Sequence, residues 1–206
     1  MNNYTSAGTA RRLAVLAGFT AALVALAACA PGNLPSPEAM NRSYDNALAR
    51  TAPIAVELPP GDAERKVFVR LEQFFSDLAP EAIQAKAQEV YAPAAYLNDN
   101  LAVVDGAPAI GRYFAHTAQR VRSLKVEMLD VMHRGSDYYA RWRMTIDSPK
   151  LADHPLASYG ITHFRFDAES RVLLHKDYWD AGTGLYEYVP VLGGLVRRVR
   201  SGANQE

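Results

Sequence analysis

Two side chains near the end of this 206-residue sequence have the types and spacing of an acid/base pair. His175 and Asp177 stand two residues apart in a segment, Arg171 to Trp179, whose alternation predicts a β-strand. Successive side chains of a strand point to opposite faces, so these two share a face and lie about 7 Å apart along it. A carboxylate beside an imidazole in an apolar cavity can move a proton near neutral pH. The alternative is that one of them points outward, or that both only satisfy buried hydrogen bonds.

The pairing of the last two strands decides which other side chains share this face. A four-residue turn over residues 167–170 would pair Phe166 with Arg171 and Thr162 with His175. A slip of one residue would exchange the two faces. With this register, one face carries most of the aromatic and apolar weight together with both titratable groups, and we assign it to the interior: Thr162, Phe164, Leu173, His175, Asp177 and Trp179.

The preceding segment, Tyr138 to Asp147, alternates in the same way. Its two arginines, Arg141 and Arg143, should point outward, because the residues between them are apolar. The side chains expected to turn inward are Ala140, Trp142, Met144 and Ile146.

Helices are expected before the run of strands, which indicates an α+β fold. Apolar residues recur at helical spacing after Asp62, a second helix should run from Pro80 to Glu89, and a third from Pro108 to Arg122. Residues 91–97 look strand-like, and a turn is expected at residues 105–106. The four strands that follow are expected at about Lys125–His133, Tyr138–Asp147, Ser158–Phe166 and Arg171–Trp179.

Composition and charge exclude several classes of protein. The chain has 22 basic and 22 acidic residues, which gives no electrostatic reason to expect a nucleic-acid partner. One cysteine cannot form an internal disulfide. The five histidines form no His-x-x-x-His pair, and no Gly-rich phosphate loop occurs. We therefore expect no metal and no organic cofactor.

The N-terminus is typical of a secretory signal. Arg11 and Arg12 precede an apolar run from Leu13 to Ala28, which is too short to span a bilayer comfortably. The following Cys29 completes a segment that resembles the lipobox of bacterial lipoproteins, in which this cysteine is acylated. The resemblance implies a lipid anchor in the cell envelope, on the periplasmic side of the outer membrane. An ordinary cleaved signal, or a buried helix with a chance cysteine, are the alternatives.

Four segments are expected along the chain. Residues 1–28 form the signal peptide, and the proline-rich residues 29–61 an extended tether with one short helix around Glu38 to Arg50. Residues 62–182 form the folded domain. Residues 183–206 combine apolar side chains with Arg197, Arg198 and Arg200, and pack on the domain or lie on an anionic membrane surface. We favour packing on the domain.

Three stretches of sequence resemble the nuclear transport factor 2-like superfamily. Residues 90–99 (VYAPAAYLND), residues 111–114 (GRYF) and residues 175–180 (HKDYWD) are similar to the corresponding parts of snoaL-like polyketide cyclases and ketosteroid isomerases. The resemblance covers about Asp62 to Asp180. It implies a cone-shaped, curved antiparallel sheet, with three N-terminal helices, around a pocket. This fold hosts enzymes, binding modules and scaffolds, so it indicates a fold more than an activity.

Two enzymes of the superfamily suggest roles for particular residues. In ketosteroid isomerases a strand carboxylate is the base, and Asp99 matches it, but the oxyanion donors fall on Leu71 and Thr162, so that site is incomplete. In limonene epoxide hydrolases an Asp of the last strand activates water, and Asp177 resembles it, with Tyr96 and Asn98 as the helper pair. The Arg and second acid which that mechanism needs are missing from the inward face of residues 138–147.

The expected function is binding, or conversion by acid/base chemistry, of a small hydrophobic molecule without a cofactor. Asp177 and His175 would be the reactive pair, and Asp99, Tyr96 and Asn98 would orient the ligand or water. The competing hypothesis is a non-enzymatic interaction module that forms a homodimer through its sheet. The pocket is expected to be lined further by Thr162, Phe164, Trp142 and Trp179.

Overall fold

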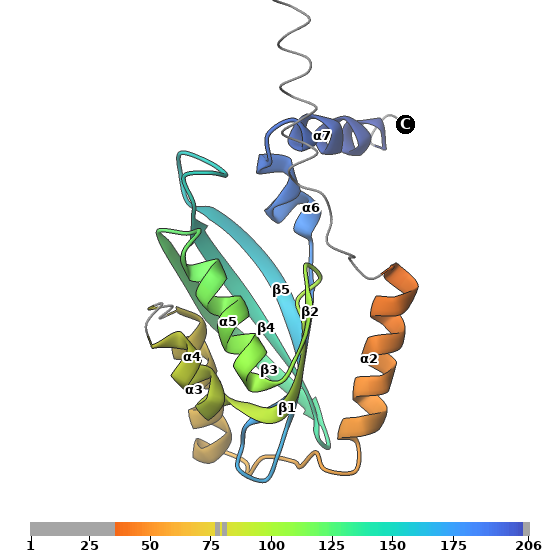
Figure 1. Cartoon of the computed structure of the whole chain (residues 1–206), viewed down its shortest axis with the longest axis vertical. Coiled ribbons are helices and arrows are strands. Elements are labelled where there is room, and N and C mark those ends of the chain that lie inside the picture. Colours follow the sequence, from red (N-terminus) through yellow and green to blue (C-terminus); the bar gives the residue numbers. More distant parts are fainter. Residues whose placement is uncertain (1–35, 77–78, 80–81, 204–206) are drawn as a thin grey trace, which may run out of the picture. The chain divides into compact units, whose positions relative to one another are not determined.

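The structure is a computed structural model that describes residues 36–76, 79 and 82–203. Its elements follow the order expected from the sequence, helices first and then a run of strands (Figure 1). The expected helix start at Pro80 and the lipobox cysteine, Cys29, lie outside the described residues. The elements are α2 (Pro37–Thr51), α3 (Asp62–Ser76), α4 (Ile83–Val90), β1 (Tyr91–Asn98), β2 (Val103–Asp105), α5 (Ala107–Ala118), β3 (Ser123–Arg134), β4 (Asp137–Asp147), β5 (Leu156–Phe166), β6 (Val172–Trp179), α6 (Ala181–Gly184), the 3-10 helix η1 (Tyr186–Tyr188) and α7 (Leu192–Gly202).

The sheet is mixed rather than purely antiparallel. Its strand order is β2-β1-β6-β5-β4-β3, and every neighbouring pair is antiparallel except β1 and β6, which run parallel. The chain between these two strands passes through α5 and four further strands, and such a long connection permits parallel pairing. The α+β class with a curved sheet is therefore confirmed, and the parallel pair β1 and β6 is the one departure among the described strands from the expected antiparallel pairing.

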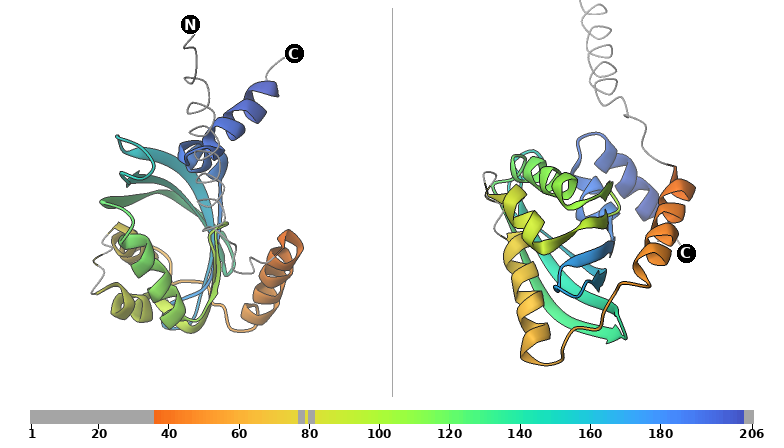
Figure 2. Two further views of the ribbon diagram at one scale, coloured as in Figure 1. Left: turned by 45° about the horizontal axis from the view of Figure 1, so that its top comes forward. Right: turned by 60° about the horizontal axis from the view of Figure 1, so that its bottom comes forward.

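Helices α3, α4 and α5 cover one face of the curved sheet (Figures 1 and 2). They contribute an apolar stripe to the main core, as amphipathic helices do. Phe68 of α3 packs its ring edge-on or tilted against Tyr138, Phe164 and Phe166 of the sheet, with ring centroids about 6 Å apart. These contacts hold the helical layer on β4 and β5, two of the strands that contribute residues to the cavity described below.

Helix α2 packs against the other face of the sheet. Ala47 is 1% exposed and shares a small core with Tyr96 and Leu174. Tyr44 donates to Nδ1 of His163 at 2.7 Å, and His163 is itself buried. A short helix was expected around Glu38 to Arg50, and α2 covers this range. Its one proline, Pro37, stands at the first helical position, where proline is tolerated.

The expected tether does not extend to residue 61. The described residues from Met40 onward belong to one compact unit. After α2 the chain stays on the domain, because Val56 forms a β-bridge with Phe166 and the amide of Leu58 donates to the hydroxyl of Tyr138 at 2.7 Å. The proline content of this stretch indicated an extended chain. It did not indicate that the chain would pack against the sheet.

The hairpin between β5 and β6 has the expected faces but a different register. Thr162 pairs with Asp177, and Phe164 with His175, which is two residues away from the expected pairing. A shift of two leaves every paired side chain on its face, because the side-chain period of a strand is two. An irregularity after Arg165 is what changes the register. It also brings Val172 into the main core, although strict alternation with Leu173 would place Val172 on the other face.

The C-terminal helices follow directly on β6. Helix α6 and η1 pack on each other, and α7 packs on η1. Within residues 183–206, Gly184 is buried against Ser158 and Trp179, whereas Leu195 and Val199 of α7 are 60% and 69% exposed. No helix within the described ranges is long and apolar enough to cross a membrane.

Candidate ligand pocket and acid/base site

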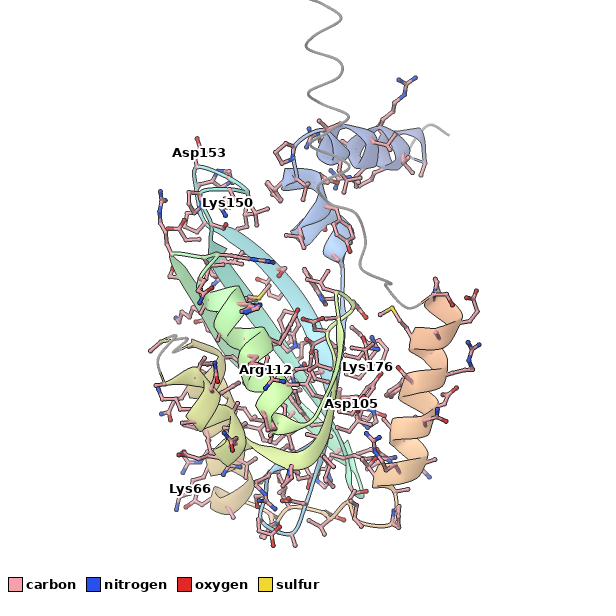
Figure 3. All side chains as sticks on the ribbon, viewed as in Figure 1. Lys66, Asp105, Arg112, Lys150, Asp153 and Lys176 are labelled. Atoms are coloured by element: carbon pink, nitrogen blue, oxygen red, sulfur yellow. The ribbon has the colours of Figure 1, made fainter. Side chains whose placement is uncertain are left out.

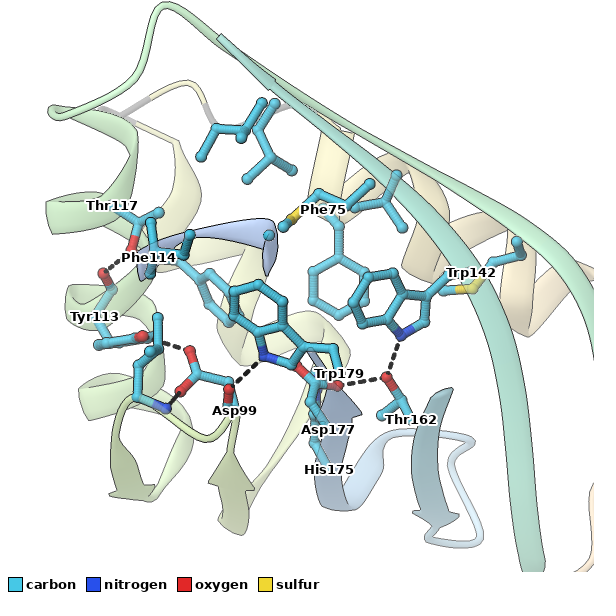
Figure 4. A pocket seen from close by; sticks show the side chains of 18 residues that line it. Phe75, Asp99, Tyr113, Phe114, Thr117, Trp142, Thr162, His175, Asp177 and Trp179 are labelled. Atoms are coloured by element: carbon cyan, nitrogen blue, oxygen red, sulfur yellow. Dashed lines mark hydrogen bonds and ion pairs between the residues drawn. The ribbon is translucent and has the colours of Figure 1, made fainter. Parts of the chain in front are cut away.

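A cavity of about 190 Å³ lies between the sheet and α5 (Figure 4). It is larger than an engineered apolar cavity of about 150 Å³ that holds benzene. Two carboxylates, Asp99 and Asp177, are the acidic groups in its wall. The rest of the wall is mainly apolar or aromatic: Phe75, Leu101, Phe114, Leu124, Val126, Met128, Trp142, Met144, Ile146, Trp179 and Leu185, with Tyr113, Thr117, Thr162, His175 and Gly184.

His175 and Asp177 form the expected pair in this wall. Nε2 of His175 lies 2.9 Å from Oδ1 of Asp177. The hydroxyl of Thr162, on the neighbouring strand, donates to the same oxygen at 2.5 Å, and Trp142 Nε1 donates to that hydroxyl at 2.8 Å. In the described part of the chain these contacts all fall on Oδ1, so the second oxygen, Oδ2, is left for a ligand or water.

Tyr91, the first residue of β1, completes this arrangement and was missed from the sequence. Its hydroxyl lies 2.9 Å from Nδ1 of His175. Burial raises the pKa of Tyr91 well above its usual value, and the charges of Asp177 and Asp99 add to this effect. The phenol is therefore a donor, which makes Nδ1 the acceptor and Nε2 the nitrogen that donates to Asp177. The shift of register between Tyr91 and Tyr96 explains why alternation along β1 did not reveal this contact.

Asp99 stands at the end of β1 as a second, differently held carboxyl. Its Oδ1 accepts from the amides of Leu101 and Ala102 at 2.9 and 2.8 Å, and its Oδ2 accepts from the hydroxyl of Tyr113. Burial raises the pKa of Asp99, and the charge of Asp177 raises it further, while these hydrogen bonds act in the opposite direction. Asp99 therefore keeps its proton to a higher pH than an exposed aspartate does.

Six of the residues expected at the site do line the cavity, and three do not. Tyr96 and Asn98 point to the opposite face, because they alternate with Leu97 of the main core. Asn98 there accepts from Lys176 Nζ at 3.1 Å, on the side of the sheet that faces α2 (Figure 3). The helper role expected for Tyr96 and Asn98 is therefore wrong. The residues that line the cavity as expected are Asp99, Trp142, Thr162, His175, Asp177 and Trp179.

Phe164 is the third residue that does not line the cavity. It is fully buried beneath it, with its ring centroid 5.0 Å from that of His175. Phe75 packs edge-on against the same imidazole at 5.6 Å. His175 is 3% exposed, and among the described residues its polar contacts are those with Tyr91 and Asp177.

The comparisons with known proteins identify the family. The SnoaL-like domain family matches residues 71–175, just over half of the chain. The chain therefore belongs to the SnoaL-like family, as the resemblance of its sequence indicated. No curated protein matches it significantly.

Solved structures share the fold at low identity. A ketosteroid isomerase-like protein from Catenulispora acidiphila, in complex with trimethylamine, has a TM-score of 0.53 at 16% identity, over 61% of this chain and 94% of that one. TsrD from Streptomyces laurentii has a TM-score of 0.51 at 14% identity, over 64% of this chain and 98% of that one. An LEH-like epoxide hydrolase from M. tuberculosis has a TM-score of 0.48 at 14% identity, over 66% and 94%.

Across residues 36–76, 79 and 82–203, no group of three or more His, Cys, Asp or Glu side chains is placed to hold a metal ion. Proton transfer, which requires only titratable groups and an apolar wall, is the chemistry for which this cavity has the residues.

Proposed function

We propose that the chain binds a small, mainly apolar molecule in this cavity and transfers a proton on it, with Asp177 as the base. One observation carries the proposal. The chain of contacts from Tyr91 through His175 ends on a single oxygen of Asp177, and its other oxygen is left at the wall of an apolar cavity. Donors fixed on one oxygen hold a carboxylate in one orientation without using the oxygen that reacts.

Asp99 is the proposed proton donor. A ligand proton that moves to Oδ2 of Asp177 leaves negative charge on the ligand, and a proton from Asp99 to another ligand atom neutralises it. Return of the proton from Asp177 to Asp99 through water restores both groups, so the ligand is isomerised without a co-reactant. The two carboxyls lie in different surroundings, which is how one site provides both an acid and a base.

The experiment has two stages. Native mass spectrometry of the full chain, purified from its own host, is expected to show a retained apolar compound. That complex is then held in deuterated water, and the mass of the released compound is measured. We expect deuterium at carbon in the wild type and none with Asp177→Asn, while Asp105→Asn, a change of an exposed aspartate on β2, leaves incorporation unchanged.

Three results would contradict the proposal or part of it. A chain that holds no compound, and takes up none from an apolar lipid extract, would refute ligand binding. A retained compound that gains no deuterium would limit the function to binding. Equal incorporation in Asp177→Asn would remove Asp177 as the base.

We further propose that the chain is anchored in the cell envelope by an acylated Cys29. The support is the sequence alone: two arginines, an apolar run and the only cysteine at its end. Cys29→Ser should release the protein from the membrane fraction, and the mature wild type should carry the mass of its acyl chains. Unchanged membrane partitioning of Cys29→Ser would refute the anchor.

A homodimer through the outer face of the sheet is the second candidate function, and one observation favours it. Tyr159, Ile161 and Tyr178 are 60%, 37% and 46% exposed, and Ile161 pairs with Tyr178 across β5 and β6. An exposed apolar sheet face of this kind is suited to a second copy of the chain. Sedimentation equilibrium should show a dimer that Tyr159→Ser and Tyr178→Ser weaken, whereas a monomeric wild type would refute it.

A further inference from the structure

The C-terminal helix α7 carries an apolar stripe that no described residue covers. Leu192, Leu195 and Val199 are 40%, 60% and 69% exposed. Their spacing of three and four residues places them on one side of the helix. The preceding Val191 is 83% exposed and has a φ of 68°, a conformation that strains a β-branched residue. Exposure of four large apolar residues within nine positions requires an explanation.

The opposite side of α7 packs on η1 and fixes the stripe outward. Gly193 lies so close to the carbonyl of Glu187 that a Cβ there would come within 2.0 Å of the oxygen. Arg197 donates to the same carbonyl at 2.6 Å, and Nε of Arg200 lies 2.9 Å from Glu187 Oε1. These contacts hold the helix by its polar side, so the apolar side is left for something outside the described chain.

The basic residues of α7 flank the stripe. At about 100° per residue, Arg198 falls beyond Leu195 on one side and Arg200 beyond Leu192 on the other. The helix Leu192–Gly202 has three arginines and no acidic residue, and Glu187 is the acid that pairs with it. An apolar stripe between cations matches an interface in which apolar side chains enter the acyl layer and cations meet anionic headgroups.

We propose that α7 lies on an anionic lipid surface, with Leu192, Leu195 and Val199 inserted and Arg198 at the headgroups, while Arg200 at the other edge of the stripe is paired with Glu187. The flanking positive charge favours anionic lipid over a second copy, because two α7 helices that met through this stripe would bring their arginines together. If Cys29 is acylated as proposed, seven residues separate it from Pro37. The eight steps from Cys29 to Pro37 span at most about 29 Å, which would then keep the domain near the bilayer.

This surface adjoins the cavity through a short connection. Gly184 and Leu185 belong to the cavity wall, and they are separated from α7 by η1 and three further residues. A helix held on the bilayer would therefore keep this part of the wall at the membrane surface. That consequence rests on the proposed function, whereas the docking of α7 does not.

Hydrogen–deuterium exchange of the full chain tests the docking without reference to the cavity. The protein is mixed with vesicles of phosphatidylglycerol and, separately, of phosphatidylcholine, and exchange is followed in the peptide that spans residues 192–202. We expect at least tenfold slower exchange on phosphatidylglycerol than on phosphatidylcholine. The double variant Leu195→Ser, Val199→Ser should lose this difference, while Val69→Ser, at an exposed apolar position of α3, should keep it.

Several outcomes would overturn the proposal. Equal protection on both lipids would show that the arginines do not select the surface. No protection on either lipid would show that α7 does not dock. Protection that appears without vesicles as the protein concentration rises would assign the stripe to a second copy. Because none of these readouts involves Asp177 or a bound compound, failure here and failure of the proposed function are distinguishable.

Discussion

His163 and His175 hold their imidazoles in the same way on opposite faces of the sheet. Each accepts a tyrosine hydroxyl at Nδ1, from Tyr44 at 2.7 Å and from Tyr91 at 2.9 Å. The Nε2 atoms lie 2.7 and 2.9 Å from a carboxylate, that of Asp137 and that of Asp177. One arrangement joins α2 to the sheet, and the other ends in the cavity. Location rather than local geometry therefore separates a structural histidine from a candidate reactive one.

The contact between Tyr91 and His175 should fix the tautomer of the imidazole. In the wild type, nitrogen chemical shifts are expected to show a protonated Nε2 and an unprotonated Nδ1. Tyr91→Phe leaves Nδ1 buried without a donor, which should lower the free energy of unfolding by about 1–3 kcal/mol and produce a mixture of tautomers. A wild type with Nδ1 protonated would contradict the assignment of Tyr91 as the donor.

Asp99 should make the protein less stable as the pH rises. Burial raises its pKa in the folded state above the ordinary value near 3.8. The folded state therefore binds the proton more tightly than the unfolded state does. The contribution of Asp99 to the free energy of unfolding is fully present below the ordinary pKa and is lost as the pH rises through the raised pKa of the folded state.

Asp99→Asn is the variant that tests this dependence. The amide cannot ionise, so the melting temperature of the variant relative to the wild type should increase from pH 3.5 to pH 7. Asp105→Asn, on exposed β2, is the control variant. A constant difference between Asp99→Asn and the wild type across this range would refute a raised pKa at Asp99.

The sequence predicted the faces of the last two strands, but it could not predict their register or what covers each face. Alternation placed His175, Asp177 and Thr162 together because side-chain period is a local property of the strand. The bulge at Leu173 depends on the turn, in which Asp167 accepts the amides of Glu169 and Arg171. The alternation of apolar and polar residues in the sequence does not reveal such a turn.

Tyr96 and Asn98 illustrate a second limit. Their roles were taken from a resemblance to another enzyme, while the direction of β1 side chains depends on an irregularity between Tyr91 and Tyr96. The same irregularity brings Tyr91 to His175, which is 84 residues away in sequence. Contacts of this range follow from tertiary packing, and a single sequence without relatives contains little signal for them.

Gly160 should be essential for the position of Trp142. These residues pair across β4 and β5, and a Cβ at Gly160 would come within 2.3 Å of the Trp142 ring. Gly160→Ala is therefore expected to cost about 1–3 kcal/mol, and to displace the indole from Thr162. The displacement should appear as a shift in tryptophan fluorescence.

The control for Gly160→Ala is Gly194→Ala on α7. A Cβ at Gly194 meets nothing within 4 Å, so alanine should be neutral or should stabilise the helix by up to about 1 kcal/mol. Equal melting temperatures for Gly160→Ala and the wild type would show that the indole does not need this space.

His163 should make the attachment of α2 sensitive to acid. Burial lowers the pKa of His163 below its ordinary value of 6.5; the hydrogen bond with Asp137 and the charge of Asp137 act in the opposite direction, and the charge of Arg165 adds to the lowering. The unfolded state then binds the proton more tightly than the folded state. The contribution of His163 to the free energy of unfolding is thus present above pH 6.5 and is lost as the pH falls through the lowered pKa of the folded state. Protonation of Nδ1 would also end its role as acceptor for Tyr44.

Chemical denaturation at pH 8, 6.5 and 5 tests this sensitivity against His163→Gln. The glutamine does not titrate, so the variant should be less stable than the wild type at pH 8 and the difference should narrow at pH 5. The matched control is His116→Gln, at an exposed histidine of α5. Exchange of the amides in α2 provides a local readout, because loss of the Tyr44 contact should speed exchange there before it does so in β4. If the gap between His163→Gln and the wild type stays constant with pH, the imidazole is not the group that titrates, and the contact between α2 and the sheet is insensitive to acid.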